Sequence, residues 1–268
     1  MTRAFLRGLR ATCGAACVAT CLTFATLAHA TSFSTNYSDL WWNPDEPGWG
    51  LNVSQQADVL FVTTFVYNAQ GQPVWYAGTL TYVGEDITGS RTWRGDLYST
   101  NGSPFIGPYD PSMFVTHKVG VANFASNAND TAIFQFVDGR SFTTKTVQRQ
   151  TLVSNNLAGS YLGATSDVSV KCLNPANNGR RTDDVGAIGI THTGSAVTIR
   201  TPGCSYAGSY FQFGQVGSVS GRYTCNNGAE GPINIYDVRV EQSGIVARYT
   251  GTSGSCQFVG SIGAARTP

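Results

Sequence analysis

Apolar and polar residues alternate with a period of two along most of the chain. A β-branched and aromatic run at 59–67 ends in a turn sequence at 68–71, and the alternation resumes at 73–82. Five residues of this returning segment share one face, as alternate residues of a β-strand do: Val74, Tyr76, Gly78, Leu80 and Tyr82. After the first thirty residues, no window of ten or more residues has helical periodicity. The pattern predicts strands throughout.

Further strands are predicted on both sides of residue 153. Those before it are expected at 49–55, 91–98, 115–124, 131–137 and 141–150. Those after it are expected at 185–192, 196–200, 205–213, 216–224, 232–241, 245–250 and 256–264. Short turns join them, and Asp138-Gly139 is a strong hairpin signal. We therefore expect an all-β fold of two small antiparallel meander or up-and-down barrel-like domains.

The composition changes near residue 153. Five tryptophans lie before it: Trp41, Trp42, Trp49, Trp75 and Trp93. Four cysteines lie after it: Cys172, Cys204, Cys225 and Cys256. This contrast predicts a Trp-rich β domain at 31–152 and a disulfide-containing β domain at 153–268, each near the usual domain size.

The first thirty residues have the pattern of a signal peptide. Three arginines precede an apolar stretch from about 11 to 27, and Ala28-His29-Ala30 forms a small-x-small cleavage pattern. The apolar run is shorter than the ~20 residues of a membrane-spanning helix. We predict cleavage before Thr31 and a periplasmic or secreted protein. A weaker alternative is a lipoprotein box that ends at Cys21.

Charge and composition exclude several classes of function. The full chain has a net charge of +1, and the mature part would have 14 basic and 16 acidic residues, a net charge of −2. A nearly neutral chain has no electrostatic footprint for nucleic acid or anionic membrane. The 41% of apolar residues are enough to build a core. No phosphate-binding or dinucleotide-binding motif occurs, so we predict no cofactor.

The four cysteines of the second half predict two disulfides, because an even number is typical of an exported chain. A zinc site is the alternative, but no C-x-x-C pair and no neighbouring histidine pair supports it. Similar spacings of 32 and 31 residues favour the pairs Cys172–Cys204 and Cys225–Cys256. The pairs Cys204–Cys225 and Cys172–Cys256 remain open as the other arrangement.

A short motif repeats in the second half. Ala158-Gly159-Ser160-Tyr161 recurs as Ala207-Gly208-Ser209-Tyr210, and Ser220-Gly221-Arg222-Tyr223 is a variant. The Gly-x-Tyr step places glycine and tyrosine on the same face of a strand. Because glycine has no side chain, an aromatic ring can lie over its backbone, which helps a tight sheet to curve.

One stretch of the first half resembles a known family. The residues Trp41-Trp42-Asn43-Pro44-Asp45-Glu46-Pro47-Gly48-Trp49-Gly50 form a WWNPxExGWG motif, and the similarity extends over most of 35–152. The motif resembles uncharacterised secreted bacterial β domains, some of which are attached to secreted proteases. The Cys/Gly-x-Tyr half resembles a β domain often attached to them. The resemblance implies export and two domains, and it brings no activity or catalytic residues.

The aromatic cluster is the main functional candidate. Seven residues are predicted to contact a ligand: Trp41, Trp42, Asp45, Glu46, Trp49, Trp75 and Tyr76. Aromatic faces stack on sugar rings and other flat ligands, and carboxylates accept hydrogen bonds from hydroxyl groups. Core packing of the same rings is the alternative, and of the adjacent Trp41 and Trp42 at least one is expected to be exposed.

Catalytic signatures are weak. His117 and His192 lie in different domains, and no Gly-x-Ser-x-Gly occurs. Asp45 and Glu46 could serve a hydrolase only with a further carboxylate across a cleft. We therefore predict no catalytic residues and a non-enzymatic binding or adhesion module with a glycan or protein ligand. The alternatives are a secreted hydrolase that uses Asp45 or Glu46 and a structural envelope protein.

Overall fold

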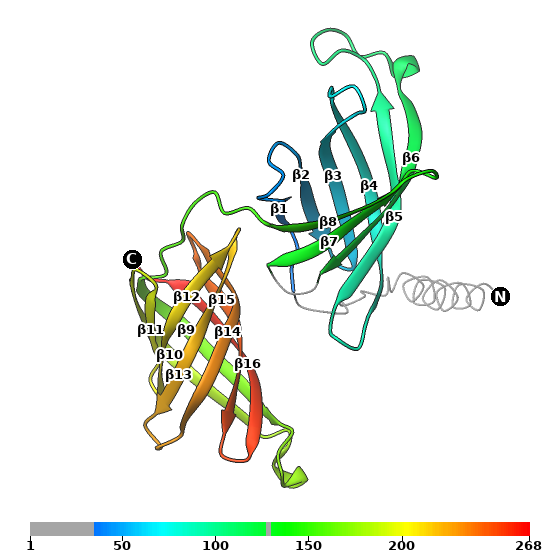
Figure 1. Cartoon of the computed structure of the whole chain (residues 1–268). Coiled ribbons are helices and arrows are strands. Elements are labelled where there is room, and N and C mark those ends of the chain that lie inside the picture. The colour runs from blue at the N-terminus through cyan, green and yellow to red at the C-terminus, as the bar shows by residue number, and fades with distance from the viewer. Residues whose placement is uncertain (1–34, 127–129) are drawn as a thin grey trace, which may run out of the picture. The chain divides into compact units, whose positions relative to one another are not determined.

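The computed structural model describes residues 35–126 and 130–268 of the chain. The predicted signal peptide and Cys21 lie outside the described residues. Two closed antiparallel barrels follow one another in the sequence, and each contains eight strands among the described residues (Figure 1). The prediction of an all-β fold with two barrel-like domains is confirmed. No helix within the described ranges is long and apolar enough to cross a membrane.

The first barrel is an up-and-down meander in which each strand pairs with its neighbours in sequence. Its strands are β1 (Asp39–Trp42), β2 (Gly50–Gln56), β3 (Val59–Tyr67), β4 (Pro73–Glu85), β5 (Arg91–Asn101), β6 (Val115–Ser126), β7 (Thr131–Val137) and β8 (Phe142–Arg149). The short helix η1 (Pro111–Met113) lies between β5 and β6. Strand β1 closes the barrel against β8 through only two residue pairs, Trp41 with Arg149 and Trp42 with Gln148.

The second barrel has the same topology and a longer closing seam. Its strands are β9 (Gly159–Val170), β10 (Arg181–Thr193), β11 (Ala196–Arg200), β12 (Cys204–Phe213), β13 (Val216–Cys225), β14 (Glu230–Glu241), β15 (Gly244–Ser253) and β16 (Cys256–Arg266), with η2 (Pro175–Asn177) between β9 and β10. The pairing of β9 with β16 runs continuously from Val170 opposite Gln257 to Tyr161 opposite Arg266.

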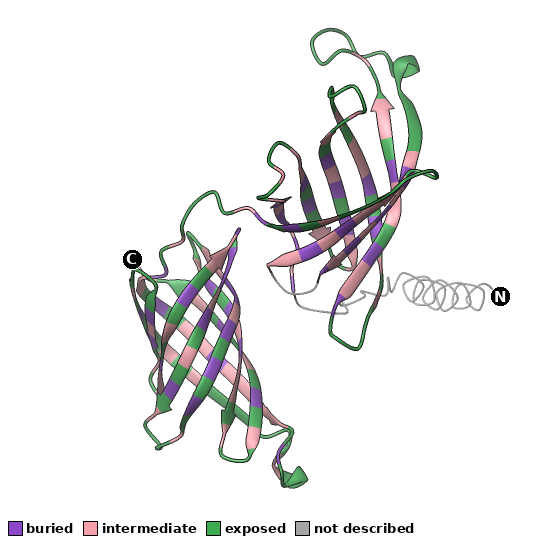
Figure 2. Cartoon of the chain, in the orientation of Figure 1, coloured by how far each residue is buried: buried purple, intermediate pink, exposed green. Residues whose placement is uncertain are grey.

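Buried and exposed residues alternate along the strands of both barrels (Figure 2). The predicted shared face of β4 is confirmed, since Gly78 and Leu80 are buried while Thr79 and Thr81 are exposed. Each barrel therefore has an interior lined by buried side chains and a solvent-facing outer surface, as expected for eight strands.

The interior of the first barrel is built around aromatic rings. Trp41 packs edge-on against Phe124 with a centroid distance of 5.1 Å, and the guanidinium of Arg149 lies 4.8 Å from the centroid of the Trp41 ring. Arg149 Nη1 donates a hydrogen bond to Asp39 Oδ2 at 3.0 Å, and both side chains are almost fully buried. This pairing lets a charged residue sit in the core.

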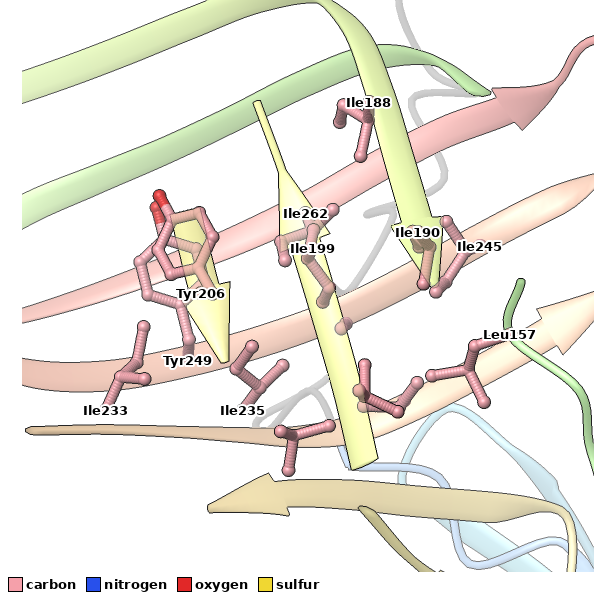
Figure 3. Close-up of a cluster of buried hydrophobic side chains, with 14 of the residues drawn as sticks. Leu157, Ile188, Ile190, Ile199, Tyr206, Ile233, Ile235, Ile245, Tyr249 and Ile262 are labelled. Carbon is pink, nitrogen blue, oxygen red and sulfur yellow. The ribbon is translucent and has the colours of Figure 1, made fainter. Parts of the chain in front are cut away.

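The second barrel contains a mostly aliphatic core with tyrosines at both ends. Figure 3 shows most of the labelled isoleucines between Leu157 and the pair Tyr206 and Tyr249, with Ile233 beyond Tyr249. Leu157 is fully buried although it precedes β9, and its carbonyl oxygen accepts a hydrogen bond from Tyr161 Oη at 2.8 Å. The segment before β9 therefore packs into one end of the barrel.

Glycines allow close approach between strands in the second barrel. A Cβ atom at Gly217, Gly251 or Gly260 would collide with the ring of Tyr210, Phe258 or Tyr249, respectively. A ring over a glycine was expected for the Gly-x-Tyr motif, but these three glycines lie outside the motif, and of the three rings only that of Tyr210 belongs to it. Gly208 and Gly221 lie opposite each other, and there the backbone of the paired strand fills the space.

The favoured disulfide pairing was wrong. The structure joins Cys204 to Cys225 and Cys172 to Cys256. Cys204 and Cys225 are direct partners on β12 and β13, and Cys256 begins the strand that closes the barrel against β9. Similar spacing is a poor guide in a closed meander, because closure brings the first and last strands together. The prediction of two disulfides is confirmed.

Candidate functional site

A cavity of about 380 Å³ lies in one end of the first barrel. The β1–β2, β3–β4, β5–β6 and β7–β8 connections all lie at this end, because the strands run up and down in sequence order. The cavity is lined by Glu46, Trp49, Thr64, Val66, Tyr67, Tyr76, Leu97, Phe134, Phe136, Thr143 and Lys145. Its size is within the usual range for a small-molecule site.

Aromatic side chains form the apolar wall of the cavity. Tyr76 of β4 and Phe136 of β7 stack with their centroids 6.1 Å apart and their planes inclined by 16°. Tyr67 ends β3 and Trp49 immediately precedes β2. These rings come from four separate parts of the meander, so closure of the barrel is what places them around one space.

A salt bridge forms the polar part of the wall. Lys145 Nζ lies 2.7 Å from Glu46 Oε2 and 2.9 Å from Glu46 Oε1, and Trp49 Nε1 donates a hydrogen bond to Glu46 Oε2 at 3.2 Å. The hydrogen bond from Lys145 is the main reason that the pKa of Glu46 lies below its ordinary value. Glu46 is therefore ionised and holds both Lys145 and Trp49 in place.

The loop that carries Glu46 has a defined conformation. The side-chain oxygen of Asn43 accepts a hydrogen bond from the backbone amide of Asp45 at 3.0 Å, and the backbone amide of Glu46 donates to the carbonyl oxygen of Asn43 at 3.2 Å. Gly48 has a φ of 108°, which favours glycine, and a Cβ there would contact the ring of Tyr67. The hydrogen bonds of Asn43 and the conformation of Gly48 thus place the loop beside Tyr67 in the cavity wall.

The Glu46–Lys145 salt bridge also completes the closure of the barrel. The β1–β8 pairing ends at Trp42 and Gln148, because the chain leaves β1 for the β1–β2 loop. Lys145 lies beyond this point on β8, and its contact with Glu46 connects the loop to β8. Side chains rather than backbone hydrogen bonds therefore join the two elements beside the cavity.

The β5–β6 loop adds apolar surface to the same end of the barrel. Phe105 and Ile106 are fully exposed, and Tyr109 is largely exposed. The loop is shaped by Ser103, whose Oγ donates to the carbonyl oxygen of Asp110 at 2.8 Å and accepts from its backbone amide. The barrel end that contains the cavity thus also presents exposed aromatic side chains.

The structure brings together three of the seven predicted ligand-contacting residues, namely Glu46, Trp49 and Tyr76, at the cavity. Trp41 was expected to contact a ligand, but it is 1% exposed and belongs to the core. Its neighbour Trp42 faces the other way and is partly exposed, as expected for adjacent strand residues. Asp45 is exposed but does not line the cavity. Trp75 is 47% exposed on the outer face of the barrel.

Sequence reasoning missed Lys145 and Phe136. The period-two pattern could have assigned both residues to the inward faces of their strands. On β8, Lys145 shares the inward face with Val147 and Arg149, so two charged residues alternate with a core residue. A charge on a core face is a recognisable signal for a paired or functional residue.

The charged groups that line the cavity are those of the Glu46–Lys145 salt bridge. Among the described residues that line it, Glu46 is the single carboxylate, and it is paired with a lysine. A glycosidase needs a second carboxyl group across the substrate, so the lining lacks that arrangement. No group of three His, Cys, Asp or Glu residues within 35–126 and 130–268 could hold a metal ion.

No family model matches the chain, and no curated protein matches it at a significant level.

Proposed function

We propose that this chain is an exported, non-enzymatic binding module whose first barrel binds a glycan unit in the cavity beside Glu46 and Lys145. The observation that carries the proposal is the combination, in one cavity, of the stacked Tyr76 and Phe136 rings with the Glu46–Lys145 salt bridge. Aromatic faces stack on the apolar faces of sugar rings. The salt bridge offers hydroxyl groups both a carboxylate acceptor and an ammonium donor.

A pair of adjacent residues on β4 provides the test. Tyr76 lines the cavity, whereas Trp75 is exposed on the outer face. After a glycan array identifies ligands, we expect Tyr76→Ala to weaken binding at least about tenfold, which corresponds to about 1.4 kcal/mol. Trp75→Ala should leave the affinity unchanged. Titration calorimetry of both variants against the wild type measures the difference.

Two results would count against the proposal. One is the absence of any glycan that binds at millimolar concentration. The other is an equal loss of affinity in Trp75→Ala and Tyr76→Ala, which would place the ligand on the outer surface. Binding of peptides in place of glycans would keep the cavity as a site but change the ligand class.

Export is supported by the first thirty residues and by the two disulfides, which persist in oxidising compartments. N-terminal sequencing of the protein recovered from the periplasm or the medium should begin at Thr31. A chain that keeps its first thirty residues would contradict this part of the proposal.

A further inference from the structure

The second barrel contains a larger cavity than the first, of about 620 Å³. The Cys204–Cys225 disulfide and Cys256 of the other disulfide line it, together with Asp167 and four aromatic residues: Tyr206, Tyr223, Tyr249 and Phe258. In the close-up, the hydroxyl groups of Tyr206 and Tyr249 point to the same side, away from Leu157 (Figure 3). The cavity therefore lies at the end of the barrel opposite the packed segment.

The four aromatic rings form a closed circuit. Successive centroid distances are 6.4 Å from Tyr206 to Tyr223, 5.4 Å from Tyr223 to Phe258, 6.0 Å from Phe258 to Tyr249 and 6.1 Å from Tyr249 back to Tyr206. Each of these residues is at most 8% exposed. The cavity thus has a continuous aromatic surface at its base.

A carboxylate faces these rings. Asp167 lies on β9 on the same inward face as the buried Thr165, and its Oδ2 accepts a hydrogen bond from Tyr249 Oη at 3.3 Å. Burial raises the pKa of Asp167, and the hydrogen bond from Tyr249 offsets the shift only in part. Among the described residues no cation forms a salt bridge with Asp167.

The other charged groups near the cavity lie at its rim. Arg181 and Arg180 line the rim and are exposed, and Arg181 Nε is paired with Asp183 at 2.9 Å. Asp184 accepts hydrogen bonds from Thr201 Oγ1 and the backbone amide of Gly203. Burial raises the pKa of Tyr206 to about 12, so this phenol is neutral at physiological pH. Among the described residues that line the cavity, Asp167 is therefore the one carboxyl group, and the cationic residues Arg180 and Arg181 lie at the rim.

The disulfides hold the aromatic residues in place. Cys204 and Cys225 are bonded to each other, and each is two residues from a ring of the circuit, Tyr206 and Tyr223. Cys256 stands in the same relation to Phe258 and is bonded to Cys172. Residues two apart on a strand share a face, so both cross-links lie directly beside the rings. Such cross-linking preorganises the cavity and reduces the entropy cost of binding.

We propose that the second barrel binds a small organic cation, a quaternary or primary ammonium group, between the aromatic circuit and Asp167. Aromatic faces attract cations through the ring quadrupole, and this attraction increases when water is excluded. Asp167 is half-buried, and a carboxylate that is partly withdrawn from water without a positive partner costs stability, so a cationic ligand would supply that partner. The site is separate from the proposed glycan site and uses none of its residues.

Choline and its neutral carbon isostere, 3,3-dimethylbutan-1-ol, are matched probes for this site. Titration calorimetry with the full mature chain should detect choline binding and at least about tenfold weaker binding of the neutral isostere. Asp167→Asn should weaken choline binding at least about tenfold, while Asp183→Asn, which alters a carboxylate at the rim, should leave it unchanged. Tyr76→Ala should also leave it unchanged, which separates this site from that of the first barrel.

Three outcomes would overturn the inference. They are the absence of choline and ethylamine binding at millimolar concentration, equal affinity for the neutral isostere, and choline binding that persists in Asp167→Asn. Circular dichroism of Asp167→Asn, compared with the wild type, shows whether the barrel is folded. If that variant does not fold, Tyr206→Leu serves as the second test, since it keeps an apolar side chain, and it should weaken choline binding more than binding of the isostere.

Discussion

The raised pKa of Asp167 has an effect on the stability of the folded protein that can be measured without any ligand. Because burial raises the pKa of this carboxyl group, the folded chain binds its proton more tightly than the unfolded chain does. Its contribution to stability is therefore complete below the unfolded pKa of about 3.9 and is lost as the pH rises through the higher folded value. Above the folded pKa, the ionised carboxylate opposes folding.

Asp167→Asn should accordingly raise the melting temperature at about pH 7, and this gain should disappear below about pH 3.5. Asp183 is the matched control on the neighbouring strand. Hydrogen bonds from Ser166 and then Arg181 lower the pKa of Asp183, so Asp183→Asn should change stability in the opposite direction with pH. Thermal unfolding of both variants across this pH range measures the two signs. A melting temperature of Asp167→Asn that is lower than wild type at about pH 7 would contradict the assignment.

At the level of residues, the sequence was a partial guide to the candidate site. The motif identified Glu46 and Trp49, since a Pro- and Gly-containing loop rich in tryptophan stands out in any strand-rich chain. It could not separate Trp41 from these, because a ring that fills a core and a ring that contacts a ligand have the same sequence pattern. Lys145 is almost a hundred residues away from Glu46, so only closure of the barrel brings them together.

At the level of elements, glycines decide how closely the strands of the second barrel approach. Gly221 of β13 lies opposite Gly208 of β12, and a Cβ at Gly221 would collide with the carbonyl oxygen of Ala207. Gly263 of β16 has open space where its Cβ would be. Gly221 and Gly263 therefore provide a test position and a control position within one barrel.

Gly221→Ala should destabilise the second barrel by about 1–3 kcal/mol, because the paired strands must separate to admit the methyl group. Gly263→Ala should be close to neutral or slightly stabilising, since it restricts the unfolded chain without a clash. Denaturant unfolding followed by far-ultraviolet dichroism measures both. Equal effects of the two substitutions would show that β12 and β13 are farther apart than described here.

Strand prediction from the period-two pattern was accurate where strands are long and regular. Two strands were missed. The four residues of β1 are too few to show alternation, and β9 carries several polar residues on its inward face near Asp167. The disulfide pairing failed for a related reason, because β9 had to be recognised as the partner of β16 before Cys172 could be matched with Cys256.

At the level of the whole molecule, the two barrels are stabilised differently. Both disulfides belong to the second barrel, whereas all five tryptophans lie in the first. Tryptophan fluorescence therefore reports on the first barrel alone. The loop-entropy model assigns each disulfide about 3 to 5 kcal/mol, with the larger value for the longer loop between Cys172 and Cys256.

Reduction should shift the unfolding transition seen by circular dichroism while the tryptophan transition stays in place. The measurement is a pair of denaturant titrations with and without reducing agent, each followed by both signals. Conversion of Cys204 and Cys225 to serine provides a control without reductant. A tryptophan transition that moves as far as the dichroism transition would mean that the barrels unfold as one unit.

Closure of both sheets also limits which segments of the chain a protease can cleave. Such enzymes bind their substrates in an extended form and hydrogen-bond to the free edge of the segment they cleave. In the part of the chain described here, each strand is paired on both sides, at least over part of its length. The accessible segments are those outside the ladders, above all the loop at 102–114 and the exposed part of the connection at 151–154. We therefore expect digestion to begin at these two places, and a cut in the connection to leave each barrel with its closed sheet.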